Sequence, residues 1–461
     1  MEVVVRFAPS PTGFLHIGGA RTAIFNYLFA RHHGGKFYLR IEDTDIERSE
    51  KRYEEEIIHS MKWLGMDYDG ELIYQTKRMD LYKTYIKKLL DSGHAYYCNC
   101  SKEDLDAERK KAMEEKRKPV YGGKCRKDPV KEGVVRFKVP ESGETVINDV
   151  VLGKIVIKHE EIEDLILART DGTPTYNFTV VIDDALMGIT HVIRGDDHVN
   201  NTPKQILIYE ALGFNLPTFV HVPMILGPDK TKLSKRHGAT AVSGYREMGY
   251  LPEALFNYLV RLGWSHGDQE IFTKEELIKA FDVDALGHSA AILNLEKLNW
   301  LNAHYIKTMD PKDMAKRICE EGLVPEEFKA RVFDKDVQKL LPMVQERSKM
   351  LPDVYKGIEF FLKDEITTEE AAVKKHITPE IKPVILELIE ALNSTDCLSD
   401  HKVLEEVFSG LIQKHNIKLK NIAQACRVLI TGGDVSPGIF EIMVLMGKEK
   451  VTKRLKSGLS A

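Results

Sequence analysis

Two short stretches of the chain carry residue types that suit phosphate binding. The first is His16-Ile17-Gly18-Gly19, which lies where an apolar segment gives way to a predicted helix. An imidazole at that point can donate a hydrogen bond to a phosphate oxygen. Gly18 has no side chain, so an adenine or ribose can approach the backbone closely. On its own, the pattern is equally typical of a turn with a surface histidine.

The second stretch is Lys232-Leu233-Ser234-Lys235-Arg236, in a polar loop that follows Gly227-Pro228-Asp229-Lys230. Two lysines three positions apart, around a small polar residue, suit a flexible clamp on a triphosphate. Taken alone, such a run is more often a solvated loop.

Three of the six cysteines, Cys98, Cys100 and Cys125, are clustered in the sequence. Zinc prefers four tetrahedral ligands, chiefly thiolates and imidazoles, so three cysteines in a short hairpin indicate a metal site whose fourth ligand is open. The alternative is three reduced thiols that pack a small hairpin. The other cysteines are scattered and are expected to be core thiols.

The phosphate-binding stretches need a scaffold, and the N-terminal sequence predicts one. Val3–Phe7 is a short apolar, β-branched run that indicates a buried parallel strand. A turn rich in Pro and Gly follows, then helical spacing over Gly19–His33 and a second strand at Phe37–Ile41. Strand, glycine-rich turn, helix and strand are typical of the start of a nucleotide-binding α/β fold.

The two stretches together resemble the paired signatures His-Ile-Gly-His and Lys-Met-Ser-Lys-Ser of class I aminoacyl-tRNA synthetases. Longer segments resemble glutamyl-tRNA synthetases almost residue for residue, over nearly the whole chain. These segments are Arg6-Phe7-Ala8-Pro9-Ser10-Pro11-Thr12-Gly13, Arg40-Ile41-Glu42-Asp43-Thr44-Asp45, Pro174-Thr175-Tyr176-Asn177-Phe178, Asp183-Asp184, His191-Val192-Ile193-Arg194-Gly195-Asp196-Asp197-His198, Leu251-Pro252-Glu253-Ala254-Leu255 and Leu262-Gly263-Trp264-Ser265.

The resemblance implies an enzyme that uses ATP with Mg²⁺ to activate L-glutamate and then ester-links the glutamate to the 3′ end of tRNA(Glu). ATP is then bound by His16, Gly18, Gly19, Lys232 and Lys235, and the charge that develops at the phosphates is stabilised by the catalytic residues His16, Lys232, Ser234 and Lys235. Gly19 stands where the first signature has its final histidine, and Leu233 and Arg236 replace Met and Ser of the second. Glutamate-type enzymes commonly vary there.

The implied substrate-binding residues are Arg6, Ser10, Glu42, Tyr176 and Arg194. Glutamate carries one ammonium and two carboxylates, so its site needs an acid and about two cations. Glu42 suits the ammonium. Arg194 is assigned to the side-chain carboxylate, because a guanidinium is the natural bidentate partner of that group. The alternative for each residue is a structural ion pair at a strand end.

The resemblance also suggests a fourth zinc ligand. Some glutamyl-type enzymes hold a zinc in an inserted domain with a Cys-x-Cys pair and a later cysteine. In their shorter relatives a tyrosine four residues before that last cysteine completes the site, and Tyr121 has this spacing. The implied site is one Zn²⁺ per chain, bound by Cys98, Cys100, Tyr121 and Cys125.

The predicted architecture is a Rossmann-like α/β class I catalytic domain, split into residues 1–75 and 175–245. An α+β acceptor-end-binding domain is inserted at 76–174, a helical stem-contact domain spans 246–322, and an all-α anticodon-binding region spans 323–461. Val180–Asp183, Thr190–Arg194 and the helix Thr202–Leu212 restore α/β character after the insertion. Arg347 lies where a cation that contacts the third anticodon base is expected.

Composition agrees with this organisation. A chain of 461 residues is too long for a single hydrophobic core, so several domains are expected. Its 43% of hydrophobic and 30% of charged residues are typical of a globular protein. The net charge of −4 neither supports nor excludes a nucleic-acid partner. No run approaches about 18 consecutive apolar residues, and the N-terminus lacks a signal pattern. We therefore expect a cytoplasmic monomer with no membrane partner.

Three other classes of protein are weighed against a full synthetase. A non-catalytic tRNA-binding or regulatory relative usually loses signature residues, whereas both lysines and His16 are kept here. A shortened relative that glutamylates a modified tRNA base lacks the region corresponding to 323–461. In glutaminyl-tRNA synthetases the corresponding opening motif tends to read Pro-Pro-Glu-Pro-Asn-Gly, whereas this chain has Ala8-Pro9-Ser10-Pro11-Thr12-Gly13. Arg194 also favours a charged substrate side chain over an amide. Whether tRNA(Gln) is also charged with glutamate stays open.

Overall fold

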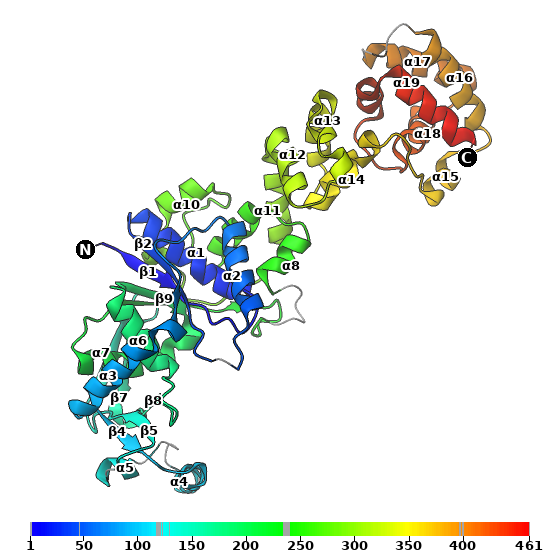
Figure 1. Ribbon diagram of the computed structural model, residues 1–461. Coiled ribbons are helices and arrows are strands. Elements are labelled where there is room, and N and C mark those ends of the chain that lie inside the picture. Colours follow the sequence, from blue (N-terminus) through cyan, green and yellow to red (C-terminus); the bar gives the residue numbers. More distant parts are fainter. Residues whose placement is uncertain are drawn as a thin grey trace. The chain divides into compact units, whose positions relative to one another are not determined.

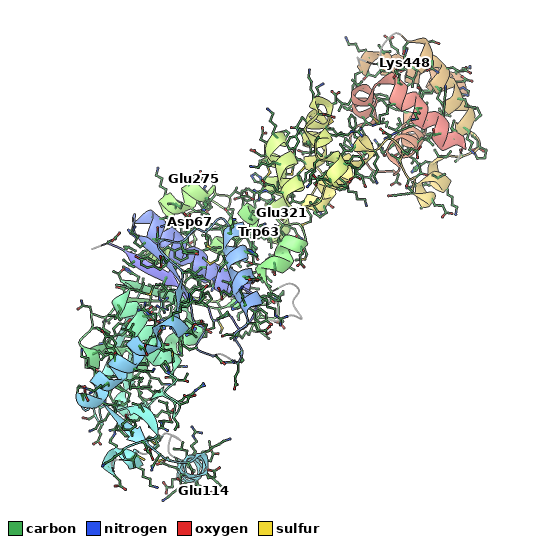
Figure 2. The ribbon with its side chains drawn as sticks, viewed as in Figure 1. Trp63, Asp67, Glu114, Glu275, Glu321 and Lys448 are labelled. Atoms are coloured by element: carbon green, nitrogen blue, oxygen red, sulfur yellow. The ribbon has the colours of Figure 1, made fainter. Side chains whose placement is uncertain are left out.

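The computed structural model describes residues 2–45, 47–116, 121, 123–128, 130–233, 240–395, 398 and 401–460 (Figure 1). The chain divides into two compact units. The first consists of Met1–Glu247 and Pro252–Leu295, and the second of Met248–Leu251 and Glu296–Ala461. Figure 2 adds the side chains, and labels Trp63 at the end of α2 (Lys51–Trp63) and Glu114 at the end of α4 (Lys102–Glu114).

Parallel strands form the centre of the first unit. One sheet has the order β1-β2-β3, with bounds Val4–Phe7, Lys36–Ile41 and Ile73–Tyr74. The other has the order β7-β6-β10-β9, with bounds Gly153–Lys158, Glu144–Asp149, Thr218–Val222 and His191–Gly195. β10 is parallel to both neighbours, and β7 is antiparallel to β6. The backbone N–H of Thr190 donates to Val4 O at 2.9 Å, so β1 and β9 lie side by side.

Helix α1 (Ile17–His32) packs against these strands and against α9 (Pro252–Arg261) and α10 (Lys274–Ala280). Its apolar side chains are almost all buried, because it is covered on more than one side. The helix ends before Gly34, whose φ of +61° suits a residue without a Cβ. The predicted strand, turn, helix and strand at the N-terminus are therefore confirmed.

Two further helices, α6 (Tyr176–Leu186) and α7 (Thr202–Leu212), pack on each other in the same unit. Thr190–Arg194 and the helix at Thr202–Leu212 lie as predicted. Val180–Asp183, whose apolar run resembles a strand, is part of α6 instead. A short buried apolar run has no periodicity that separates a strand from a helix, so its packing decided the outcome.

The stretch predicted as an insertion, 76–174, contributes to two sheets. A three-stranded antiparallel sheet, β4-β5-β8, comprises Ala95–Cys98, Val134–Phe137 and Ile166–Ala168, beside α3 (Met79–Asp91) and α5 (Lys124–Lys127). The hairpin β6–β7 instead joins the parallel strands, with Asp149 opposite Phe219 of β10. Part of this stretch is therefore continuous with the sheet of the first unit.

The remainder of the first unit includes α8 (Val242–Glu247) and the short parallel pair β11 (Ile225–Leu226) and β12 (Ala291–Ile292). The second unit is helical over its described residues, as predicted. Its helices are α11 (Leu295–Thr308, which begins at the unit boundary), α12 (Pro311–Glu320), α13 (Lys335–Gln345), α14 (Leu351–Leu362), α15 (Glu370–His376), α16 (Ile381–Ser394), α17 (His401–His415), α18 (Leu419–Thr431) and α19 (Ile439–Ser460). None of the described helices combines the length and apolar character that a membrane span requires.

Candidate active site

A cavity of about 760 Å³ opens at the carboxyl ends of β1, β2, β9 and β10. Ligands of open α/β sheets bind at this edge, because the loops that follow parallel strands meet there. Its lining contains the predicted residues that the structure describes in this region: Arg6, Ser10, His16, Gly18, Gly19, Glu42, Tyr176, Arg194 and Lys232. Ser234 and Lys235 lie outside the described residues.

Both flanks of the segment that carries Ser234 and Lys235 are attached at this cavity. On the N-terminal side, Lys232 forms an isolated antiparallel bridge with Leu226 of β11. On the C-terminal side, Ala241 forms such a bridge with His16. His16 and Lys232, more than 200 positions apart in the sequence, thus line the same cavity.

His16 occupies the N-cap of α1. Its Nδ1 accepts the backbone N–H of Gly19 at 3.0 Å, so the neutral ring carries its hydrogen on Nε2. The His16 side chain is exposed in the cavity. Partial desolvation by the surrounding protein is the largest cause that lowers the pKa of His16; the charge of Asp197 opposes this shift, and the charge of Lys232 adds to it. The result at neutral pH is an uncharged donor at the start of a helix, where anions are favoured. A Cβ on Gly18 would lie 3.1 Å from Nδ1 of His16, so a larger residue at position 18 would crowd the ring.

Arg6 and Glu42 belong to a buried charge cluster. The guanidinium of Arg6 donates through Nε and Nη2 to both oxygens of Asp184, at 3.0 and 3.1 Å. Arg40 donates to Asp184 Oδ1 at 2.7 Å and to Glu42 Oε1 at 3.0 Å. Burial alone would raise the pKa of Asp184, but Arg6 and Arg40 hold it below its usual value. Both Arg6 and Glu42 therefore form structural ion pairs while they also line the cavity.

Arg194 differs from Arg6 in its partners. Its Nε donates to His221 Nε2 at 3.1 Å and its Nη2 to Thr202 Oγ1 at 2.8 Å, and both partners are neutral. Among the described residues, no carboxylate lies within ion-pair distance of this guanidinium. Burial, as the largest cause, lowers the pKa of Arg194. The structural ion pair considered for this residue is not found in the described part of the chain, so its charge is available to a ligand.

Tyr176 lies beside His198, with a hydrogen bond of 3.0 Å between its hydroxyl and His198 Nδ1. Burial, aided by the nearby charge of Glu42, raises the pKa of Tyr176 to about 12, so it stays a phenol. Burial and the charge of Arg194 lower the pKa of His198 to about 4, so this imidazole is neutral. Ser10 is exposed on the loop after β1.

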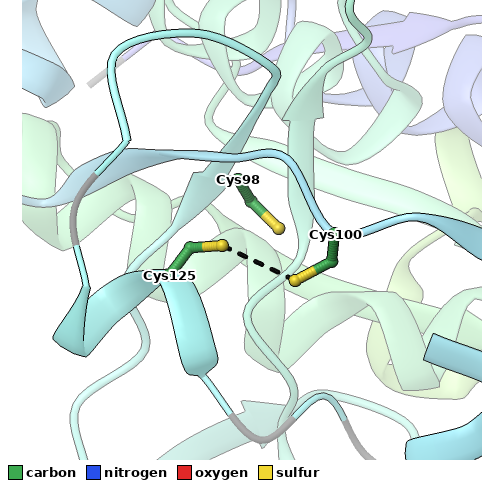
Figure 3. Close-up of side chains that lie close together, drawn as sticks. All are labelled: Cys98, Cys100 and Cys125. Atoms are coloured by element: carbon green, nitrogen blue, oxygen red, sulfur yellow. Dashed lines mark hydrogen bonds between the residues drawn. The ribbon is translucent and has the colours of Figure 1, made fainter. Parts of the chain in front are cut away.

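The three cysteines among the predicted zinc ligands, Cys98, Cys100 and Cys125, converge between β4 and α5 (Figure 3). The Sγ atoms of Cys100 and Cys125 are 3.5 Å apart, and the hydroxyl oxygen of Tyr121 is 3.4 Å from Cys98 Sγ and 3.8 Å from Cys100 Sγ. Ligands around tetrahedral zinc are about 3.5–3.8 Å apart, from Zn–S and Zn–O lengths near 2.3 and 2.0 Å. The three thiols and Tyr121 therefore fit one metal ion such as zinc.

The surroundings of Cys98 favour its thiolate form, whereas burial raises the pKa of Cys100 to about 11. Burial opposes ionisation of Cys98, but hydrogen bonds with Tyr121 and Cys100, together with Arg136, lower its pKa to about 7. Arg136 also lies over the ring of Tyr121, at 4.1 Å from its centroid. A thiolate is the form that binds zinc.

Four residues near the cavity carry no role in the sequence-based site: Arg40, Asp149, Asp184 and His221. Arg40 is on β2 and Glu42 directly follows its end, two positions on, so their side chains point to the same face, and that spacing is the available signal. His221 is a polar residue within the apolar strand β10, which requires a buried partner. The identity of that partner, Asp149, has no local signal because it lies 72 positions away.

Comparison with known proteins agrees with the geometry. The family model of class I tRNA synthetases (E and Q), catalytic domain, matches residues 2–300, and the anticodon binding domain model matches 313–459. The glutamate–tRNA ligase of Syntrophobacter fumaroxidans is 51% identical over 99% of this chain and 98% of that protein. That of Geobacter sulfurreducens is 50% identical over 100% and 99% of the two chains.

A solved structure is similar over the whole chain. The crystal structure of a glutamate tRNA ligase from Elizabethkingia meningosepticum, in complex with its amino acid, gives a TM-score of 0.86 at 33% identity and covers 100% of both chains. Two family models, relatives of about half identical sequence and a shared fold lead to one conclusion. The chain belongs to the glutamate–tRNA ligase family of class I aminoacyl-tRNA synthetases.

Proposed function

We propose that this chain activates L-glutamate with the magnesium complex of ATP and transfers the glutamyl group to the 3′ end of tRNA(Glu). The observation that carries this proposal is Arg194, a buried guanidinium without an ion-pair partner among the described residues, in the same cavity as His16 and Lys232. With respect to the described residues, that cavity combines an unmatched guanidinium for a side-chain carboxylate with donors for a triphosphate.

In the first step, an oxygen of the α-carboxylate of glutamate attacks the α-phosphorus of ATP, and pyrophosphate leaves. To the Nε2–H of His16 and the ammonium of Lys232, which line the cavity, we assign the stabilisation of the charge that develops on the phosphate oxygens. We assign the same role to Ser234 and Lys235, since the flanks of their segment are attached at the cavity. In the second step, a ribose hydroxyl of the terminal tRNA nucleotide attacks the glutamyl carbonyl, and AMP leaves.

The amino acid is held by groups of opposite sign. Glu42 has only its Oε1 engaged by a described residue, so the other oxygen is assigned to the substrate ammonium. Tyr176 and Ser10 add hydroxyl groups, and Arg6 adds positive charge next to Asp184. Arg194 is assigned to the side-chain carboxylate, because a glutamine amide would leave its charge unmatched in a buried place.

The tRNA contacts are assigned by region. We assign residues 76–174 to the acceptor end of the tRNA, 246–322 to its stem and 323–461 to its anticodon. We also propose that the protein is a monomer. In the last region, Arg347 Nη1 donates to Ser436 O at 2.9 Å and Arg427 Nε donates to Ser436 Oγ at 2.8 Å. Two guanidinium groups meet there, which supports a polyanionic ligand. Zinc on Cys98, Cys100, Tyr121 and Cys125 would cross-link the end of β4 to α5, within the region that we assign to the acceptor end.

The test is tRNA charging with purified protein, with glutamate and glutamine supplied separately and with tRNA(Glu) and tRNA(Gln) as acceptors. We expect glutamate to be attached to tRNA(Glu) and glutamine to be used at least about 10³-fold less well. Attachment of glutamate to both acceptors would establish the non-discriminating alternative. No charging of either acceptor, by protein that still binds tRNA, would establish a non-catalytic relative.

A further inference from the structure

Behind Arg194 lies a buried chain of hydrogen bonds that ends on the hairpin β6–β7. Arg194 Nε donates to His221 Nε2 at 3.1 Å, and His221 Nδ1 lies 2.6 Å from Asp149 Oδ2. The side chains of His221 and Asp149 are fully buried, and neither residue lines the cavity. The chain therefore reaches the pocket only through Arg194.

The chemistry of the three groups fixes where the hydrogens are. A guanidinium only donates, so His221 Nε2 has to present a lone pair to Arg194. The imidazole hydrogen is then on Nδ1, where the carboxylate of Asp149 accepts it. An imidazolium would aim a donor at the guanidinium, so the ring works only in its neutral Nδ1–H form.

Asp149 is itself held by backbone groups. Its Oδ1 accepts the N–H groups of Val151 at 3.0 Å and Leu152 at 2.8 Å, in the turn of the hairpin. Its Oδ2 also accepts the backbone N–H of His221 at 3.1 Å. Several donors converge on this carboxylate, so its position is set by the hairpin and by β10 together.

The other side of the guanidinium is also fixed. Arg194 Nη2 donates to Thr202 Oγ1 at 2.8 Å, and Thr202 is fully buried at the start of α7. Two of the three nitrogens are thereby held by neutral acceptors, and the third, Nη1, has no hydrogen-bond partner among the described residues, in a side chain that lines the cavity. A carboxylate in place of His221 would hold the arginine as firmly, but it would also neutralise the charge.

We propose that His221 and Asp149 are positioning residues that orient Arg194 towards the substrate side chain, and that they thereby contribute to the choice of glutamate over glutamine. The imidazole lies between the guanidinium and the carboxylate of Asp149, so Arg194 is fixed in place and keeps its positive charge for the ligand. This inference rests on the proposed function, in which Arg194 binds the side-chain carboxylate of glutamate.

The test compares His221→Phe, which keeps a ring but removes both nitrogens, with His221→Gln, which keeps a donor and an acceptor. We expect His221→Phe to raise KM for glutamate about tenfold or more and to reduce the preference for glutamate over glutamine by a similar factor. KM for ATP should change less than about twofold. His221→Gln should recover most of the preference.

Asp149→Asn provides an independent arm, because Asp149 touches neither Arg194 nor the cavity. The amide can still accept the N–H groups of Val151 and Leu152 through its oxygen. Its NH₂, in place of Oδ2, would no longer accept the backbone N–H of His221; it would donate to His221 Nδ1 and favour the opposite tautomer. The hydrogen would then be on Nε2, facing Arg194. We expect the same selective rise in KM for glutamate as in His221→Phe.

Ile206→Val is the matched control, since Ile206 packs in the apolar cluster with Phe219 and Val192 but has no part in the hydrogen-bond chain. It should leave both KM values and the preference unchanged. Equal effects of His221→Phe on glutamate, glutamine and ATP, or equal values for His221→Phe and His221→Gln, would overturn the inference. Failure of the unaltered protein to charge tRNA with glutamate would instead overturn the proposed function.

Discussion

Arg6 is paired with Asp184 through two parallel hydrogen bonds, whereas Arg194, in the same cavity, has neutral partners within the described part of the chain. The charge of Arg6 is therefore largely matched before any ligand binds. An anionic side chain gains more from the unmatched guanidinium. This difference decides which arginine we assign to the carboxylate that distinguishes glutamate from glutamine.

Replacing Arg194 with glutamine should lower kcat/KM for glutamate by at least about 10²-fold, because a charge-assisted contact is lost, while the small activity with glutamine is unchanged or rises. Tyr176→Phe is the comparison, and it should cost less because a neutral hydrogen bond is lost. Parallel charging with the two amino acids at saturating ATP measures both. An equal loss for both would mean that Arg194 holds the α-carboxylate shared by the two substrates and that the side-chain assignment passes to Arg6.

His16 caps α1, and we also propose that it donates to a phosphate of ATP; two substitutions separate these functions. His16→Asn should keep an acceptor for the Gly19 N–H but lose the Nε2–H donor, so single-turnover charging should slow by about 10²–10³-fold with little change in stability. His16→Gln retains an amide donor further from the backbone and should be less impaired. Lys235→Ala should slow the reaction as His16→Asn does. A normal single-turnover rate for either slow variant would remove that residue from the mechanism.

The pH profile of kcat/KM for glutamate should fall along its acidic limb at a higher pH than an ordinary glutamate side chain would cause, because of Glu42. Burial, the largest cause, raises the pKa of Glu42, although Arg40 and Arg6 oppose the shift. The carboxylate that receives the substrate ammonium is present above this pKa and is lost as the pH falls through it. We expect kcat/KM for glutamate to decline with falling pH before an ordinary glutamate would titrate, near 4.3.

The control for that pH profile is Glu42→Gln, which should have low activity throughout and no such limb. KM for ATP in the unaltered protein should lack the limb as well. If the limb persists unchanged in Glu42→Gln, another group is responsible and the assignment of the ammonium to Glu42 is wrong.

Protein purified without chelator should contain about one zinc per chain, because three thiols and a phenol oxygen meet at distances that suit a tetrahedral ion. Cys98→Ser and Cys125→Ser should lose the metal and weaken tRNA use more than ATP binding. Cys426→Ser is the matched control, since Cys426 is a buried thiol on α18 that is not part of the cluster, and it should retain zinc.

Two results would revise the zinc site. A metal-free native protein with full activity would exclude it. Full zinc content in Tyr121→Phe would mean that another group, such as water, supplies the fourth ligand.

The sequence was most informative where local pattern and chemistry coincide. The strand at Val3–Phe7, the turn after it and the helix near His16 were predictable, because strand length, glycine and proline positions and helical spacing all indicate the same elements. The family and the fold class are confirmed. The roles of individual site residues stay predictions, although the cavity brings together those that the structure describes.

Other features depended on contacts between distant positions. That Arg6 pairs with Asp184, 178 positions away, is not visible in either local sequence, since each is also suited to contact substrate or metal. The hairpin β6–β7 belongs to the predicted insertion by position, but its pairing with β10 is set by the apolar faces that the folded sheet offers. Val180–Asp183 shows the same limit, because its burial suits a strand and a helix equally.

The placement of Asp149 on β6 has a consequence for building chimeric enzymes. If 76–174 were exchanged as one cassette between relatives, the graft would replace Asp149 and with it the anchor of a histidine that belongs to the recipient. A junction that leaves Glu144–Lys158 in the recipient would preserve that anchor and transfer the sheet β4-β5-β8 together with its helices and the three clustered cysteines. Modularity in this protein therefore follows the pairing of its strands and not the order of its sequence.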